Sequence, residues 1–179
     1  MEKYLTLFTI FLAVLVITSC SPGLQTYNKH NISFTVTNEL KLVEYKVDPS
    51  TMTKHIGESS YQNGMIMSSE GNFVLLWVLT TPKYTDKEIR ISILSTPDSF
   101  ESNTGKFKAT ITSDLLTTII AGFEITYAKM NFTLPNWSAS GITAVWYCPD
   151  SQRTFQIILI NNKPETEMRR FIRSFSCIP

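Results

Sequence analysis

The sequence has little of what most catalytic and metal-binding motifs are built from. It contains two histidines, three cysteines and seven glycines in 179 residues. No H-E-x-x-H, C-x-x-C, P-loop, G-x-G-x-x-G or G-x-S-x-G pattern occurs. The motifs of zinc peptidases, nucleotide-binding proteins and α/β-hydrolases are therefore excluded, and we expect no metal and no cofactor. An active site assembled from distant residues is recognised by geometry, so that alternative stays open.

Neither sign of charge dominates. Sixteen Lys and Arg residues face fifteen Asp and Glu residues, which gives a net charge of +1. A nucleic-acid-binding domain needs a basic excess, so we expect no nucleic acid as a partner. The acidic residues are scattered and form no calcium-binding loop. His30 and His55 each stand alone in polar segments, where we expect surface residues.

Charge is also absent from one long segment near the start of the chain. Residues 4–17 are uncharged and mostly apolar. A membrane-spanning helix needs about 20 such residues, so this run has the length of a signal-peptide core instead. Residues 17–20 (ITSC) resemble the lipobox of prokaryotic lipoproteins, in which the cysteine takes a thioether-linked lipid. We predict a signal peptide over residues 1–19 and lipidation at Cys20; cleavage nearby without lipid and an uncleaved anchor are the alternatives.

The remaining chain has the length of one ordinary domain. We expect residues 20–30 to be the lipidated N-terminus and a short linker, and residues 31–179 to be a single domain. Such a protein would be held by its lipid at the extracytoplasmic face of the cell membrane.

Hydrophobic periodicity predicts mostly strands. Residues 32–36 and 40–47 alternate on either side of a turn at 37–39, which predicts a hairpin. A second hairpin is predicted from residues 142–147 and 154–160, which flank a turn-rich hexapeptide. Further strands are expected at residues 65–67, 73–79 and 122–132.

Three helices are predicted beside these strands. Thr85 and Glu88 fit a capping box ahead of an apolar helical face, although the isoleucines at 89–93 also alternate as in a strand. A four-residue period over residues 107–119 predicts a second helix. Pro164 begins a third helix, whose apolar stripe should pack on the sheet, with arginines on the other side. The stripe consists of Met168, Phe171, Ile172 and Phe175.

Two cysteines remain once Cys20 is assigned to lipid. Cys148 ends a strand and Cys177 ends the last helix. Paired cysteines of exported domains usually form disulfides, because the compartments outside the cytoplasm are oxidising. We predict a disulfide between Cys148 and Cys177; two reduced buried thiols are the alternative. The missing C-x-x-C spacing makes this bond structural rather than redox-active.

The C-terminal half carries a family likeness. Residues 141–153 (GITAVWYCPDSQR), 155–158 and 171–177, together with residues 31–36 (NISFTV), resemble small archaeal cell-envelope proteins with a PsbP-like domain. The resemblance implies an α+β fold in which a mostly antiparallel sheet is flanked by helices as an α/β/α sandwich. It implies no activity. The wider fold family includes an extrinsic photosystem subunit and a nuclear-transport adaptor, which share the binding of partners.

Two groups of residues are candidates for contact with a partner. Trp137 closes an aromatic and amide-rich segment at residues 131–137, and a tryptophan folded back on its own hairpin is the alternative. The basic face of the last helix could meet a protein or anionic lipid, or could simply be solvated. Its residues are Arg169, Arg170 and Arg173. N-x-S/T sequons stand at Asn31, Asn131 and Asn136.

The sequence therefore predicts a lipid-anchored binding or accessory module of the cell envelope. The expected partners are the membrane, through the N-terminal lipid, and an envelope protein. The alternatives are an envelope hydrolase with an active site assembled from distant residues and a glycosylated coat component.

Overall fold

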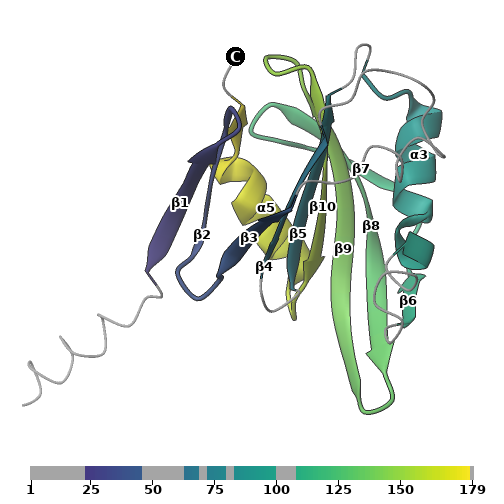
Figure 1. Cartoon of the computed structure of the whole chain (residues 1–179). Helices are drawn as coiled ribbons and strands as arrows, with labels where there is room; N and C mark the ends of the chain where they lie inside the picture. Colours follow the sequence, from purple (N-terminus) through teal and green to yellow (C-terminus); the bar gives the residue numbers. More distant parts are fainter. Residues whose placement is uncertain (1–22, 46–62, 69–71, 80–82, 100–107, 178–179) are drawn as a thin grey trace, which may run out of the picture.

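The computed structural model describes residues 23–45, 63–68, 72–79, 83–99 and 108–177 of the chain (Figure 1). Strands dominate these parts, and two longer helices accompany them. The helices are α3 (Asp86–Leu94) and α5 (Pro164–Ser174). The strands are β1 (Leu24–Lys29), β2 (Ile32–Thr37), β3 (Leu42–Tyr45), β4 (Asn63–Ser68), β5 (Phe73–Leu79), β6 (Lys108–Ile111), β7 (Leu116–Ile120), β8 (Phe123–Leu134), β9 (Trp137–Cys148), β10 (Arg153–Ile160) and β11 (Ser176–Cys177).

Eight of the strands form one large antiparallel sheet. Its order is β3-β4-β5-β10-β9-β8-β6, and β7 pairs with β8 next to β6. The predicted hairpin of β9 and β10 is confirmed, and β9 starts at Trp137, earlier than expected. The apolar run of β5 lies inside the sheet between β4 and β10, as its composition indicated. The mostly antiparallel sheet of the prediction is thus confirmed.

A small second sheet contains the start and the end of the described chain. Its order is β1-β2-β11, again antiparallel. The segment expected as a linker forms β1, so the predicted hairpin of β2 with β3 is wrong: β2 pairs with β1, and β3 belongs to the large sheet. The turn between β1 and β2 has positive φ at His30 (55°) and Asn31 (58°), as the tightest hairpin turns require.

The helix α5 packs between the two sheets and supplies the centre of the main core. Met168, Phe171 and Ile172 are buried, and Phe175 follows directly after the helix, so the predicted apolar stripe is confirmed. Phe175 meets Trp146 of β9 edge-to-face, with 5.1 Å between ring centroids. Such aromatic packing stabilises beyond the area it buries. Helix α5 therefore holds the small sheet against the large one.

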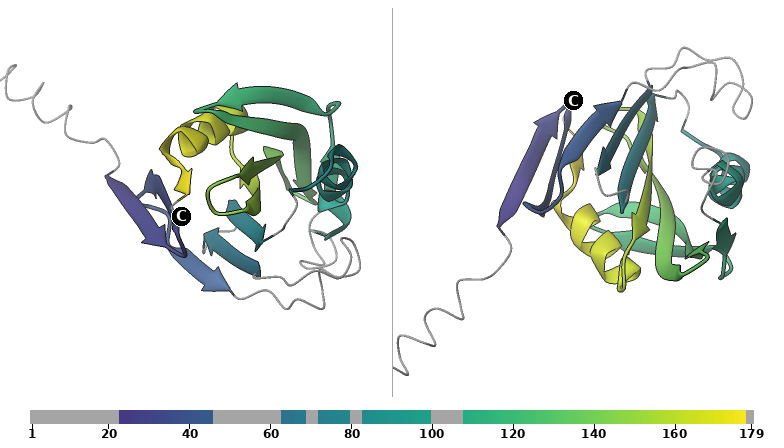
Figure 2. Two further views of the ribbon diagram at one scale, coloured as in Figure 1. Left: turned by 90° about the horizontal axis from the view of Figure 1, so that it is seen from above. Right: turned by 60° about the horizontal axis from the view of Figure 1, so that its bottom comes forward.

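The opposite face of the large sheet carries α3 (Figure 2). The predicted capping box is present, since Thr85 accepts from the backbone of Glu88 and the Glu88 carboxylate accepts from the backbone of Thr85. The helix buries Ile93 against Ala128 and Val145. The alternative of a strand at this position is therefore wrong.

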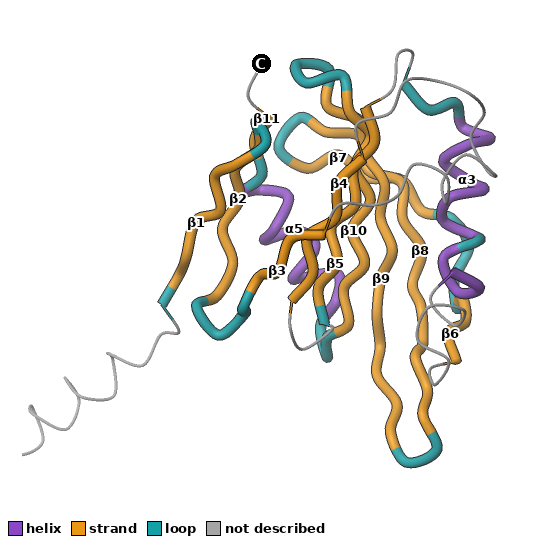
Figure 3. Tube along the Cα trace, in the orientation of Figure 1, coloured by secondary structure: helices purple, strands orange, loops and turns teal. Residues whose placement is uncertain are grey.

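The helix predicted over residues 107–119 is wrong. Residues 108–111 and 116–120 are the strands β6 and β7, both paired with β8, and residue 107 lies outside the described parts. Threonines are frequent here, and β-branched residues favour a pleated surface over a helix. Without this helix the layers are unequal, so the domain is dominated by sheet and is not a balanced α/β/α sandwich (Figure 3).

One glycine allows close packing within the long hairpin of β8 and β9. A Cβ atom at Gly141 would lie 2.3 Å from Cε2 of Phe132 and 2.8 Å from the carbonyl oxygen of Leu159. Only glycine therefore lets the buried ring of Phe132 lie across the neighbouring strand.

Candidate functional site

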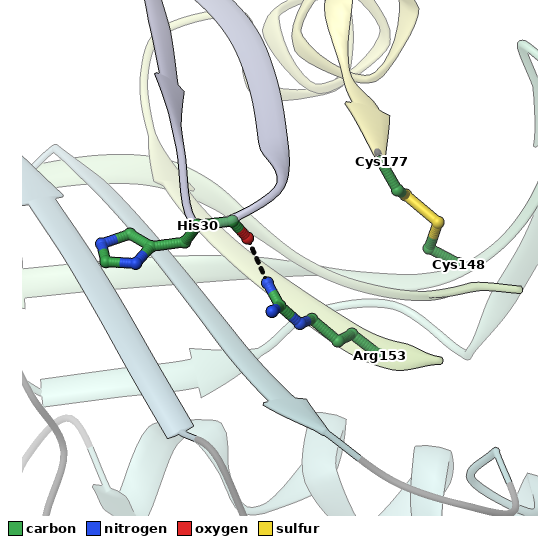
Figure 4. Close-up of a disulfide and its surroundings, with 4 residues drawn as sticks. All are labelled: His30, Cys148, Arg153 and Cys177. Carbon is green, nitrogen blue, oxygen red and sulfur yellow. Dashed lines mark hydrogen bonds between the residues drawn. A yellow bond between two sulfur atoms is a disulfide. The ribbon is translucent and has the colours of Figure 1, made fainter. Parts of the chain in front are cut away.

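The two ends of the molecule differ in chemistry. Cys148 ends β9, and Cys177 pairs with Ile32 at the start of β2, so these residues lie at one end of both sheets. We call it the disulfide end (Figure 4). Leu24 pairs with Thr37 at the other end of the small sheet. The end that carries Leu24 and Trp137 is the Leu24 end.

The disulfide end brings the two predicted cysteines together. The sulfur atoms of Cys148 and Cys177 lie 2.00 Å apart and the Cα atoms 6.5 Å apart, the spacing of a disulfide. The pair joins β9 of the large sheet to β11 of the small sheet (Figure 4).

Arg153 makes a second connection at the same end. Its guanidinium donates to the carbonyl oxygen of His30 in the turn between β1 and β2 (Figure 4). Arg153 stands directly opposite Cys148 in the pairing of β10 with β9. Burial lowers the pKa of the guanidinium, and its Nε is buried without a hydrogen-bond partner among the described residues.

Glu44 of β3 makes a third connection. Its carboxylate lies 2.8 Å from Nε2 of His30 and accepts from Nζ of Lys29 at 2.9 Å. Hydrogen bonds from His30 and then Lys29 lower the pKa of Glu44 to about 2. Burial, followed by the nearby charge of Glu44, raises the pKa of Tyr27. As expected, His30 is a surface residue, with about half of its side chain exposed.

All three connections at the disulfide end link the small sheet to the large sheet. They consist of a close cysteine pair, one arginine on a backbone carbonyl and one carboxylate between two basic groups. Each of these groups interacts with a residue of the other sheet, so we assign the three connections a structural role.

The basic face of α5 is only partly available. Glu165 interacts with Arg169 at 3.4 Å and with Lys129 of β8 at 3.5 Å, and Tyr127 donates to the same carboxylate. Partial burial alone would raise the pKa of Glu165, but the contacts with Arg169 and Lys129 lower it overall. Arg169 is therefore engaged with its own helix.

The other two arginines of α5 differ from each other. Arg170 pairs with Glu167 at 2.5 Å. Arg173 is exposed and forms no ion pair among the described residues. Of the three predicted arginines, Arg173 presents the least compensated charge.

Trp137 lies apart from these arginines. It pairs with Leu134 at the tip of the β8–β9 hairpin, and 45% of its surface is exposed. Lys129, which contacts Glu165 of α5, precedes Leu134 by five positions on β8. At ~3.4 Å per residue this is about 17 Å along the strand, so the predicted contact residues form two surfaces.

A polar network beneath α3 was not predicted. The side-chain amide of Gln156 on β10 donates to Oγ1 of Thr143 at 2.9 Å and to Oγ1 of Thr96 at 2.8 Å, and its oxygen accepts from Ser92 at 2.9 Å. The sequence signal for this network was Gln156 itself, the one amide in a mostly apolar strand at residues 154–160. Satisfied buried networks of this kind fix one arrangement of the packed elements.

Several predicted features lie outside the described residues or remain predictions. The signal peptide at 1–19, Cys20 and His55 are outside. Of the sequons, Asn31 is in the β1–β2 turn, Asn131 pairs with Ser140, and Asn136 is exposed at the hairpin tip. Within the described ranges no group of three His, Cys, Asp or Glu residues could hold a metal ion. No helix in those ranges is long and apolar enough to cross a bilayer.

Solved structures identify the fold. The cyanobacterial PsbP protein CyanoP from Synechocystis is similar over 89% of this chain and 95% of that chain, with a TM-score of 0.53 and 10% sequence identity. The fold is PsbP-like. A Pseudomonas aeruginosa protein of unknown function matches 87% of this chain and 98% of its own at 8% identity, but its TM-score of 0.39 is too low to indicate a shared fold. No protein-family model and no curated protein match the sequence.

Removing the cysteine pair should destabilise this PsbP-like domain. A bond between Cys148 and Cys177, separated by 29 positions, contributes roughly 3–4 kcal/mol in the chain-entropy description. We expect the double variant Cys148→Ser/Cys177→Ser to lose about that free energy of unfolding, measured by denaturant titration. A reductant should lower the free energy of unfolding of the wild type but not that of the double variant. Free thiols at both positions in non-reducing peptide maps of the wild type would contradict the bond.

Acid should weaken the link between β1 and β3 through Glu44. The pKa of Glu44 in the folded protein, about 2, lies below its ordinary value of 4.5. Its stabilisation is therefore complete above about pH 4.5 and is lost as the pH falls toward about 2. We expect Glu44→Gln to flatten the pH dependence of thermal unfolding in that interval. Glu39→Gln, at an exposed position in the β2–β3 connection, is the control; equal curves for both variants would refute the role of Glu44.

Proposed function

We propose that the protein is a lipid-anchored binding or accessory module that works outside the cytoplasm, in the envelope of an archaeal cell. A lipid on Cys20 holds it at the membrane, and its folded domain engages an envelope protein. The observation that carries the proposal is the uncharged run at residues 4–17, followed at once by a lipobox-like segment that ends in Cys20.

The features of the domain support an exported protein of this kind. Cys148 and Cys177 lie at disulfide distance, and disulfides persist in oxidising compartments outside the cytoplasm. The PsbP-like fold agrees with the resemblance noted in the sequence, and the wider fold family works by binding partners. The exposed side of α5 is the proposed contact surface, because Arg173 offers a charge that its own helix does not compensate.

Replacing Cys20 tests the anchor. We expect the wild type to sediment with membranes and to be released by detergent, and its intact mass should include lipid on an N-terminal Cys20. The variant Cys20→Ala should carry no lipid and should no longer sediment with membranes, because no thiol remains to form the thioether. Ser21→Ala, one residue later, should behave as the wild type. A mature wild-type chain that begins at unmodified Ser21 or later would refute the anchor.

Charge reversal on α5 tests the contact surface. A photoreactive residue in place of exposed Thr166 should crosslink an envelope protein in native membranes, with identification by mass spectrometry. We expect Arg173→Glu to weaken that crosslink by about tenfold, equivalent to ~1.4 kcal/mol of binding free energy. Arg90→Glu, on the exposed side of α3, is the matched control. Equal yields for both variants would contradict a role for this surface.

A further inference from the structure

The Leu24 end has features that fit a membrane surface. The tip of the β8–β9 hairpin (residues 134–137) projects from this end beyond the start of β1 (Figure 1). We propose that the Leu24 end faces the bilayer, with this tip in the headgroup region and Trp137 in contact with lipid. The inference rests on the proposed lipid anchor and specifies how the anchored domain is oriented.

The chain enters the domain at the Leu24 end. The carbonyl oxygen of Gly23 accepts from the backbone of Asn38 at 2.7 Å, so the backbone is fixed from Gly23 onward. Three residue steps separate Cys20 from Gly23, and each spans at most ~3.6 Å, or about 11 Å in total. A lipid on Cys20 therefore holds this end of the domain within about 11 Å of the bilayer surface.

The hairpin tip reaches farther than this connection. Measured from the disulfide end, β2 has six residues up to Thr37, and β9 has twelve down to Trp137. At ~3.4 Å per residue step these lengths are roughly 17 Å and 37 Å. The tip thus projects about 20 Å past Leu24, which exceeds the ~11 Å reach of the connecting segment. With the strands along the membrane normal, the tip must meet the bilayer.

The composition of the hairpin suits that position. Residues 130–149, between Lys129 and Asp150, contain no charged side chain. Entry of the hairpin itself into the headgroup region therefore desolvates no charge, and the exposed Lys108 of β6, opposite Thr133, can direct its charge toward lipid phosphates. Trp137 is 45% exposed, and tryptophan is the residue type that concentrates at membrane–water interfaces. The exposed amide of Asn136 and hydroxyl of Ser138 can hydrogen-bond to headgroups or to their water.

The surrounding surface at this end supports the same orientation. Leu24 is 65% exposed, the largest exposure of a described large hydrophobic residue except Ile119. Lys41 precedes β3 and Lys163 precedes α5, and both are exposed at this end, together with Glu39. Lysines near an apolar contact can direct their charge toward lipid phosphates. The disulfide end then points away from the membrane.

Lipid quenching of tryptophan fluorescence tests the orientation. The lipidated full-length mature protein is reconstituted into vesicles of phosphatidylcholine and phosphatidylglycerol that contain a lipid brominated near the headgroup. We expect the brominated lipid to quench the wild type by about the share of one of its three tryptophans. Trp137→Phe should abolish this quenching and leave the other tryptophans unaffected. The variant Trp137→Phe/Asp150→Trp, with its new tryptophan at the disulfide end, should also stay unquenched.

The outcomes separate this inference from the anchor on which it depends. Intact mass shows first whether Cys20 carries lipid; an unmodified Cys20 would overturn the anchor and the orientation together. A lipidated, vesicle-bound wild type without quenching would overturn the orientation alone. A glycan on Asn136 in the native protein would also overturn it, because a large polar sugar next to Trp137 would keep that side chain out of contact with lipid. Quenching of the tryptophan at the disulfide end would indicate the reverse orientation.

Discussion

The burial of α5 between the two sheets is the interaction on which the rest of the structure depends. The small sheet is a hairpin of two six-residue strands to which β11 adds only two residues, and a hairpin of this kind has little stability alone. Phe171 packs on Phe34 of the small sheet at 4.9 Å between ring centroids, and Phe175 packs on Phe155 of the large sheet at the same distance. Ser174 bonds the backbone of Thr35 at 3.0 Å. One helix thus supplies a core to both sheets.

The contacts at the disulfide end act on this shared core. The cysteine pair, Arg153 and Glu44 each cross from one sheet to the other beside the β1–β2 turn. They restrict how the small sheet can move relative to the large one. The Leu24 end has fewer such described links and carries the exposed, uncharged hairpin tip. A protein held by its N-terminus would therefore present one firmly joined end away from its attachment and a contact surface toward it.

Local patterns predicted those elements whose signal lies within one segment. The capping box at Thr85, the apolar stripe of α5 and the turn before Arg153 each indicated the correct structure. The period over residues 107–119 misled, because spacing by four also places residues on one face of a strand. Its threonines were the better guide. The partner of β2 could not be read from neighbouring residues, since strand pairing depends on contacts that compete across the whole chain.

The sequence alone determined the parity of the cysteines, the absence of charge between Lys129 and Asp150 and the predominance of strands, and it supplies the lipobox-like segment on which the proposed export rests. These features follow from composition and short-range periodicity. Only the tertiary structure decided that Glu44 meets Lys29 and His30, that Gln156 joins α3 to the sheet, and that Trp137 and Arg173 lie on separate surfaces. The polar contacts of Glu44 and of Gln156 with α3 span from 14 to 64 positions, because tertiary packing, and not sequence distance, brings these groups to their partners.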